Sequence, residues 1–277
     1  MNQPLKESRF VAITRDAWEG SVRESSPDMV AHEEPLEIRL GTVPLAVVMR
    51  TPGHDVELGW GFALTERIVD DVASIRSIRY CPEVDVEESE ENVLQILLEP
   101  GTEVDFARLK RNLFASSSCG ICGKATRENA LAVAAPIVSS ATVDARVLQA
   151  LPDRLRKLQE GFEATGGLHA SGLFRLDGSV QVVREDVGRH NAVDKVIGWA
   201  IGAGASLEES VLMVSGRVSF EIVQKALAAR IPFIAAVSAP TSLAVSLATD
   251  AGITLIGFLR GNRMNVYAGG ARVMHGG

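Results

Sequence analysis

Residues 210–260 read SVLMVSGRVSFEIVQKALAARIPFIAAVSAPTSLAVSLATDAGITLIGFLR, and this stretch decides the fold of the chain. Three short apolar runs, Val211–Val214, Phe233–Val237 and Ile253–Ile256, each end in a polar or glycine-containing turn. The first two runs then lead into segments with helical spacing of apolar residues. Continuous apolar strands that alternate with helices are typical of a parallel sheet covered on both faces. The stretch therefore predicts an α/β fold.

Composition limits the class of protein. The chain has 277 residues, 46% hydrophobic and 23% charged, which excludes disordered, collagen-like and coiled-coil proteins. Residues 1–110 hold 11 basic and 22 acidic residues, a net charge of −11, whereas residues 111–277 hold 17 and 13, a net charge of +4. The total of −7 makes long nucleic acid an unfavourable partner. The basic part is compatible with a small phosphorylated ligand.

Patterning divides the chain into three parts. Residues 1–30 are polar and lack periodicity, so we expect a flexible leader. Residues 31–112 are expected to form a small α+β domain, with one helix between the second and third of four strands. These strands are Leu36–Leu40, Val43–Arg50, Ile75–Tyr80 and Val93–Leu98. Residues 113–277 form the larger α/β domain, where Asp177-Gly178 between two apolar runs predicts a hairpin.

The sequence gives no sign of membrane insertion. The first 30 residues lack the apolar run of a signal peptide. Ile231–Thr249 is 19 residues long without a charge, but Pro232 and Pro240 divide it into a strand, a turn and the start of a helix. A bilayer span needs about 20 apolar residues, so this segment is expected to be buried core. We therefore expect a cytoplasmic protein that contacts no membrane.

The loops after the three apolar runs predict a binding site. In open α/β sheets, ligands bind outside the carboxyl ends of the strands. The side chains expected there are Ser215, Arg217, Ser238, Thr241, Arg260 and Arg263. Hydroxyls, arginines and helix N-termini together suit a phosphate. The alternative is that the serine and threonine side chains only cap helices.

The motif Cys119-Gly120-Ile121-Cys122-Gly123 carries the strongest chemical signal. The glycines permit a tight turn, and Lys124 and Arg127 favour the nucleophilic thiolate. Such a pair can hold zinc, form a redox dithiol or carry a transferable sulfur as a persulfide. A zinc site needs four ligands, and no second paired motif is present. A thioredoxin-like dithiol should follow a strand, whereas the segment Asp105–Phe114 is expected to be helical.

Zinc deaminase chemistry is not expected. Those enzymes use H-x-E followed by P-C-x-x-C, but here Ser118 replaces the proline. The motif Gly167-Leu168-His169 follows the cysteines instead of preceding them and lacks the glutamate. No metal ligand is therefore assigned.

A dense polar segment lies between an expected strand and an expected helix. It reads Glu185-Asp186-Val187-Gly188-Arg189-His190-Asn191, with Asp194 and Lys195 following. His190 is a candidate for proton transfer or ligand contact, although caps and ion pairs would also explain much of the segment. His169 is a further candidate for ligand contact. Cys81 is expected to have no chemical role.

These motifs, taken in order, resemble those of the FdhD/NarQ family, the formate dehydrogenase accessory sulfurtransferases. The resemblance covers roughly residues 30–270. It is carried by the Cys119–Gly123 motif, Gly167–Ala170, Glu185–Lys195, Ser215–Arg217, Ala236–Thr241 and Gly257–Tyr267. It departs from the common family pattern at Glu66-Arg67, where relatives often have Glu-Gly.

The resemblance implies a function and a fold. Family members accept sulfur from a cysteine desulfurase and pass it to the molybdenum cofactor, bis(molybdopterin guanine dinucleotide), which formate dehydrogenase needs. The implied fold is a three-layer α/β/α, cytidine-deaminase-like domain with a smaller N-terminal α+β domain, in a homodimer. Cys119 would carry the persulfide and Cys122 would be its partner. The loop Phe258-Leu259-Arg260-Gly261-Asn262-Arg263 would contact the cofactor, with a GDP-like nucleotide as a surrogate ligand. An alternative is a non-enzymatic carrier that inserts the cofactor.

Overall fold

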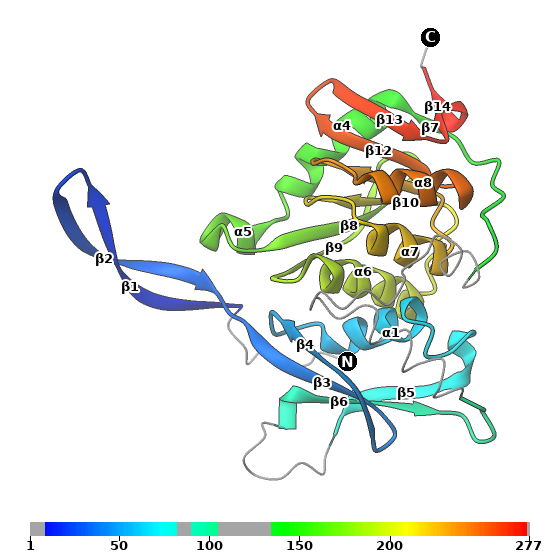
Figure 1. Ribbon diagram of the computed structural model, residues 1–277, viewed down its shortest axis with the longest axis horizontal. Coiled ribbons are helices and arrows are strands. Elements are labelled where there is room, and N and C mark those ends of the chain that lie inside the picture. Colours follow the sequence, from blue (N-terminus) through cyan, green and yellow to red (C-terminus); the bar gives the residue numbers. More distant parts are fainter. Residues whose placement is uncertain (1–8, 82–89, 105–133, 276–277) are drawn as a thin grey trace.

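The computed structural model describes residues 9–81, 90–104 and 134–275. Figure 1 shows a larger α/β unit, a smaller α+β unit against one side of it, and a projecting two-stranded arm. The helix expected at Asp105–Phe114 lies outside the described residues.

A six-stranded sheet forms the centre of the larger unit, in the order β13-β12-β11-β10-β8-β9. The strands β10 (Ser210–Val214), β11 (Phe233–Ala236) and β12 (Thr254–Arg260) are parallel, as the sequence predicts. The other three strands run antiparallel to their neighbours, so the sheet is mixed. They are β8 (His169–Arg175), β9 (Val180–Asp186) and β13 (Arg263–Ala268). The hairpin predicted at Asp177-Gly178 is confirmed as the β8–β9 turn.

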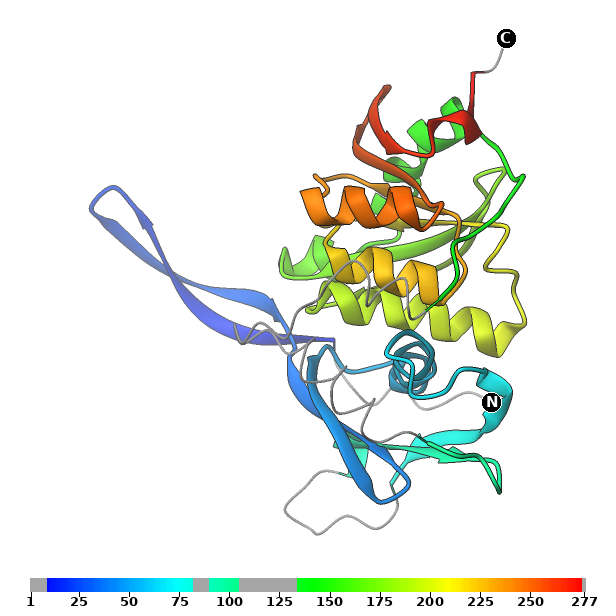
Figure 2. The same cartoon turned by 45° about the vertical axis from the view of Figure 1, so that its right-hand side comes forward.

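Helices cover both faces of this sheet. The helices α6 (Arg189–Ala203), α7 (Phe220–Ala228) and α8 (Ser242–Asp250) pack on one face around Leu212 and Ile234 (Figure 2). On the other face, α4 (Ala145–Arg156) packs around Val211 and Phe233. Successive residues of the central strands alternate between the two apolar clusters, because side chains alternate across a strand. The uncharged stretch Ile231–Thr249 contains β11 and all of α8 except its last residue.

The smaller unit has a four-stranded sheet in the order β4-β3-β6-β5. Its strands are β3 (Glu34–Leu40), β4 (Val43–Arg50), β5 (Ile75–Tyr80) and β6 (Val93–Leu98). The helix α1 (Asp55–Thr65), which lies between β4 and β5 in the chain, packs on this sheet. Leu36, Leu58 and Leu94 are fully buried between the sheet and α1. All four predicted strands are confirmed.

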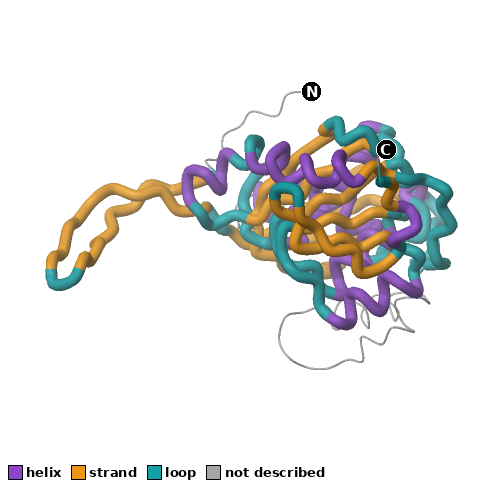
Figure 3. Tube along the Cα trace, turned by 90° about the horizontal axis from the view of Figure 1, so that it is seen from above, coloured by secondary structure: helices purple, strands orange, loops and turns teal. Residues whose placement is uncertain are grey.

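The described part of the expected flexible leader, residues 1–30, consists mainly of regular strands. The strands β1 (Phe10–Glu19) and β2 (Val22–Ala31) form an antiparallel ribbon that projects from the body (Figure 3). Most side chains of β1 are exposed on both faces of the ribbon. A strand with no buried face needs no alternation of apolar and polar residues, which is why its sequence shows none.

The arm is anchored to the larger unit at its base. Arg9 pairs with Glu160 of the short helix α5 (Glu160–Thr165), with 3.2 Å between nitrogen and oxygen. Arg9 also lies 3.7 Å from the buried carboxylate of Glu185.

The two units meet through α1 and α6, which lie side by side in Figures 1 and 2. A Cβ atom built on Gly61 would come within 1.9 Å of the backbone oxygen of Asp194. Only glycine permits backbones to approach this closely. The small unit is therefore fixed against the helix whose N-terminus lies at the edge described next.

Candidate functional site

Most sequence-predicted ligand residues meet at one edge of the six-stranded sheet. The strands β10, β11 and β12 end there, β8 begins there and β9 ends there, because β8 is antiparallel to both β9 and β10. We call this the strand-end edge. It comprises His169, Arg189, His190, Ser215, Arg217, Ser219, Glu221, Ser238, Thr241, Phe258 and Arg260.

His169 and Ser215 lie together at the start of β8. The Ser215 hydroxyl accepts a hydrogen bond from the Ala170 N–H at 3.0 Å, and the Ser215 N–H donates to the Ala170 oxygen at 3.0 Å. A Cβ atom on Gly216 would come within 3.3 Å of Nδ1 of His169, so a glycine here leaves room for the imidazole. Ser215 therefore uses both its hydroxyl and its N–H to hold the backbone beside His169.

Positive charge surrounds His169. Burial, together with Arg189, His190 and Arg217 nearby, lowers the pKa of His169 below its ordinary value, and Asp186 opposes this shift. Such an environment favours an anion, because a bound negative charge would offset the repulsion among these groups. Arg217 is exposed at this edge.

His190 faces the beginning of α7. Its Nε2 lies 3.4 Å from the Ser219 hydroxyl and 3.4 Å from Oε2 of Glu221. The Ser219 hydroxyl in turn donates to Glu221 at 2.7 Å. The hydrogen bond from His190 is the main reason that the pKa of Glu221 is lowered to about 2. Ser219 and Glu221 were not among the predicted site residues, because nothing nearby in the sequence indicates the distant histidine.

The loops after β10 and β11 are held together by their backbones. The Val218 N–H donates to the Ala239 oxygen at 3.1 Å, and the Thr241 N–H donates to the Val218 oxygen at 3.0 Å. The Thr241 hydroxyl accepts from the Ala244 N–H at 3.3 Å and so caps α8. The capping interpretation is thus confirmed for Thr241. Ser238 is partly buried, and its oxygen accepts from Phe258.

The segment Phe258–Arg263 comprises the end of β12, the two-residue turn Gly261-Asn262 and the first residue of β13, and is not an extended loop after β12. Phe258 adopts a positive φ of 51° and is 43% exposed, which places its ring in solvent beside Ser238. Leu259 is fully buried in the core on the α4 side, so its side chain cannot contact a ligand. Arg260, Gly261, Asn262 and Arg263 are exposed. The Asn262 oxygen accepts from Gln149 of α4 at 2.9 Å.

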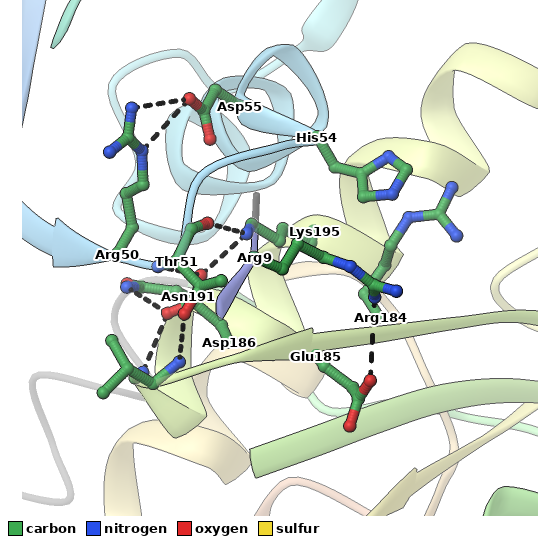
Figure 4. Close-up of polar contacts among 12 residues, drawn as sticks. Arg9, Arg50, Thr51, His54, Asp55, Arg184, Glu185, Asp186, Asn191 and Lys195 are labelled. Carbon is green, nitrogen blue, oxygen red and sulfur yellow. Dashed lines mark hydrogen bonds and ion pairs between the residues drawn. The ribbon is translucent and has the colours of Figure 1, made fainter. Parts of the chain in front are cut away.

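The polar segment 185–195 serves mainly to join parts of the molecule. The Glu185 carboxylate accepts the N–H groups of Gly161 and Phe162 at the start of α5. Figure 4 shows Asp186 and Lys195 directed at Thr51 of the small unit, and Asn191 donates to the Met49 oxygen. The ion-pair interpretation is confirmed for Asp186 and Lys195, while Arg189 and His190 remain at the strand-end edge.

The two predicted sulfur-carrying residues, Cys119 and Cys122, lie outside the described residues. Among residues 9–81, 90–104 and 134–275, no group of three or more His, Cys, Asp and Glu side chains is placed to hold a metal ion. Cys81 is buried in the small unit. In the part of the chain that the structure describes, no helix is long and apolar enough to cross a bilayer.

Comparison with known proteins identifies the family. The model of the FdhD/NarQ family matches residues 31–274. The chain belongs to the FdhD/NarQ family. It is 51% identical to the sulfur carrier protein FdhD of Mycolicibacterium paratuberculosis over 251 residues, which cover 89% of this chain and 92% of that protein. It is 49% identical to the sulfur carrier protein FdhD of Streptomyces coelicolor, with 97% and 96% of the two chains covered.

A solved structure shares the fold of this FdhD/NarQ chain. It is a crystal structure from Desulfotalea psychrophila, of a protein assigned as a formate dehydrogenase accessory protein. The two superpose with a TM-score of 0.78 at 24% identity, covering 96% of this chain and all of the other. This likeness supports the mixed α/β architecture.

Proposed function

We propose that this protein is a sulfurtransferase that carries sulfur to the molybdenum cofactor of a formate dehydrogenase. The observation that carries the proposal is the FdhD/NarQ match over residues 31–274, together with relatives named sulfur carrier proteins. A cysteine desulfurase is the proposed donor, and formate dehydrogenase the proposed recipient. We further propose a cytoplasmic homodimer with cytidine-deaminase-like layering of the larger unit.

Cys119 is the proposed sulfur carrier. Its thiolate attacks the terminal sulfur of the donor's persulfide, which forms the Cys119 persulfide and releases the donor's thiolate. The Cys122 thiolate then attacks Sγ of Cys119, which forms a Cys119–Cys122 disulfide and releases the terminal sulfur as sulfide to the cofactor. Cys122 is the proposed partner thiol in this relay, and Lys124 and Arg127 favour the thiolate form of both.

The strand-end edge is the proposed site for the guanine dinucleotide part of the cofactor. Its cationic residues Arg189, Arg217 and Arg260, with Arg263 opposite Arg260 across the β12–β13 turn, supply donors that suit phosphate oxygens. His169 and His190 lie among these cations and add two ring nitrogens. Ser238 and the backbone at the start of α8 add neutral donors. The bis(molybdopterin guanine dinucleotide) is substrate here, with GDP as a testable surrogate.

Mass spectrometry of Cys119 tests the proposal. The protein is incubated with a cysteine desulfurase and cysteine, alkylated and digested, and the Cys119 peptide is expected to gain one sulfur atom. Cys119→Ala should abolish activation of formate dehydrogenase and leave GDP binding unchanged. Cys81→Ala is the matched control and should keep both properties.

A non-enzymatic cofactor carrier is the alternative function. In that case Cys119 would remain unmodified after incubation with the desulfurase, and Cys119→Ala would still activate the dehydrogenase. Either result would overturn the persulfide role.

A further inference from the structure

Two buried clusters of polar residues join the small unit to the larger one. The site-side lock consists of Thr51, Asp186, Asn191 and Lys195. The distal lock consists of Thr65, Glu66, Asp194 and Lys225. Both contain a threonine of the small unit and a buried lysine–aspartate pair, with nitrogen–oxygen distances of 2.7 Å in the first and 2.8 Å in the second.

Asp186 is the centre of the site-side lock (Figure 4). Its Oδ2 accepts the Thr51 N–H at 3.1 Å and lies 2.7 Å from Nζ of Lys195. Its Oδ1 accepts the Gly188 N–H at 2.8 Å and Nδ2 of Asn191 at 2.9 Å. The side chain is fully buried, so all four contacts replace lost hydration.

The small unit supplies the other half of this lock. The Thr51 oxygen accepts from Lys195 at 2.8 Å, and the Thr51 hydroxyl accepts from the Val187 N–H at 3.2 Å. The Met49 oxygen accepts from Asn191 at 2.7 Å. The loop before α6 and its first turn are thus held by the end of β4 and the residue that follows it.

The first turn of α6 carries two residues of the strand-end edge. Arg189 and His190 lie between Gly188 and Asn191, which Asp186 holds on either side. Asp186 is also the register partner of His169 across β8 and β9. The Asp186 carboxylate therefore holds the turn that carries Arg189 and His190, and the Asp186 backbone lies opposite His169 in the sheet.

The distal lock has no such neighbours. Lys225 donates to the Thr65 hydroxyl at 2.9 Å, to Glu66 at 2.7 Å and to both oxygens of Asp194. Asp194 lies in the second turn of α6, and its contacts point toward the end of α1. This lock joins the same two units without touching the first turn of α6.

We propose that Asp186 and Thr51 are positioning residues for anion binding, so that docking of the small unit through the site-side lock assembles the strand-end edge. The inference rests on the nucleotide site of the proposed function and deepens it. The small unit becomes part of the binding site although none of its side chains needs to touch the ligand. Disruption of the site-side lock should therefore weaken binding beyond any loss of stability.

Matched variants of the two locks separate positioning from stability. Thr51→Val and Lys195→Met alter the site-side lock, while Thr65→Val and Lys225→Met alter the distal lock. The threonine-to-valine variants preserve the size of the side chain. They still test the proposal if a lysine variant fails to fold. GDP affinity is measured by calorimetry, and the pKa values of His169 and His190 by NMR, on the full chain.

Site-side variants are expected to weaken GDP binding about tenfold, the effect of losing about 1.4 kcal/mol. The pKa of His169 should rise toward 6.5, because a looser edge hydrates the ring and separates it from Arg189. Distal variants should leave the GDP affinity within about twofold of wild type and the pKa of His169 unchanged, although they lower the stability of the protein. Equal changes in the site-side and the distal variants, or no change in the site-side variants, would overturn the positioning role. If wild-type protein binds no GDP, the nucleotide part of the proposed function fails, and the histidine pKa values alone decide the positioning role.

Discussion

Gly198 of α6 lies against Glu57 of α1, so closely that a Cβ atom on Gly198 would come within 1.8 Å of the Glu57 backbone oxygen. Together with Gly61, this glycine permits the backbones of the two units to meet. The backbone oxygen cannot move aside as a flexible side chain would. The contact therefore makes the junction between the units sensitive to a single added methyl group.

Gly198→Ala is expected to lower the free energy of unfolding by about 2–3 kcal/mol, because the methyl group forces α1 and α6 apart. Gly202→Ala in the same helix is the control, since no heavy atom lies within 4 Å of its added Cβ. That change should be neutral or stabilise by up to about 1 kcal/mol through helix propensity. Denaturant unfolding of both variants measures the difference. Similar stabilities would show that α1 and α6 do not cross this closely.

Arg50 offers a second test of the small unit. The residue is fully buried, and its guanidinium contacts Asp55 and Glu34 at 3.1 Å and Asn92 at 3.0 Å. Arg50→Met should destabilise by about 3–5 kcal/mol, because it leaves the buried Asp55 without its counter-charge. Thermal and denaturant unfolding give the measurement.

Arg39→Met is the matched control for Arg50→Met. Arg39 pairs bidentately with Glu37, but both side chains are partly exposed. A partly exposed pair contributes about 0–1 kcal/mol, so the loss should be small. Equal losses for the two variants would contradict the role given to burial of Arg50.

The parts of the fold that the sequence predicts are those with one or two buried faces. The bounds of β5 and β6 agree with the prediction, because burial of Ile78 and Ile96 produces recognisable apolar patterns. The ribbon of β1 and β2 was missed because none of its side chains is buried. β13 was missed for a similar reason, with Val266 and Tyr267 both exposed.

The sequence likewise predicts only part of the candidate site. Loops at strand ends follow from topology, so Ser215, Arg217 and Ser238 could be expected at one edge. The residues that hold these side chains in place could not be predicted, because they lie far away in the sequence. Thr51 meets Asp186 across 135 positions, and no local pattern records that contact. The buried state of Leu259 was equally hidden, since its motif alone suggested a ligand loop.

Glu221 predicts a dependence of stability on acid pH. Its pKa is lowered from 4.5 to about 2 in the folded protein, chiefly by the hydrogen bond from His190. A depressed carboxyl pKa contributes stability that is complete above pH 4.5 and is lost as the pH falls toward about 2. The difference in unfolding free energy between wild type and Glu221→Gln should therefore shrink steadily between pH 5 and pH 3. A constant difference over this range would show that Glu221 is not paired with His190.

His169 predicts that anion binding is linked to protons. Burial, together with Arg189, His190 and Arg217 nearby, lowers its pKa in the free protein, so a bound phosphate must raise it. By linkage, the protonated form binds the anion more tightly, and GDP affinity should rise as the pH falls from 8 to 6. Calorimetry in buffers of different ionisation enthalpy should also detect proton uptake on binding. His169→Asn should reduce both effects, whereas Trp18→Ala at the exposed end of the arm should leave them unchanged. Affinity that is independent of pH in the wild type would exclude a phosphate beside His169.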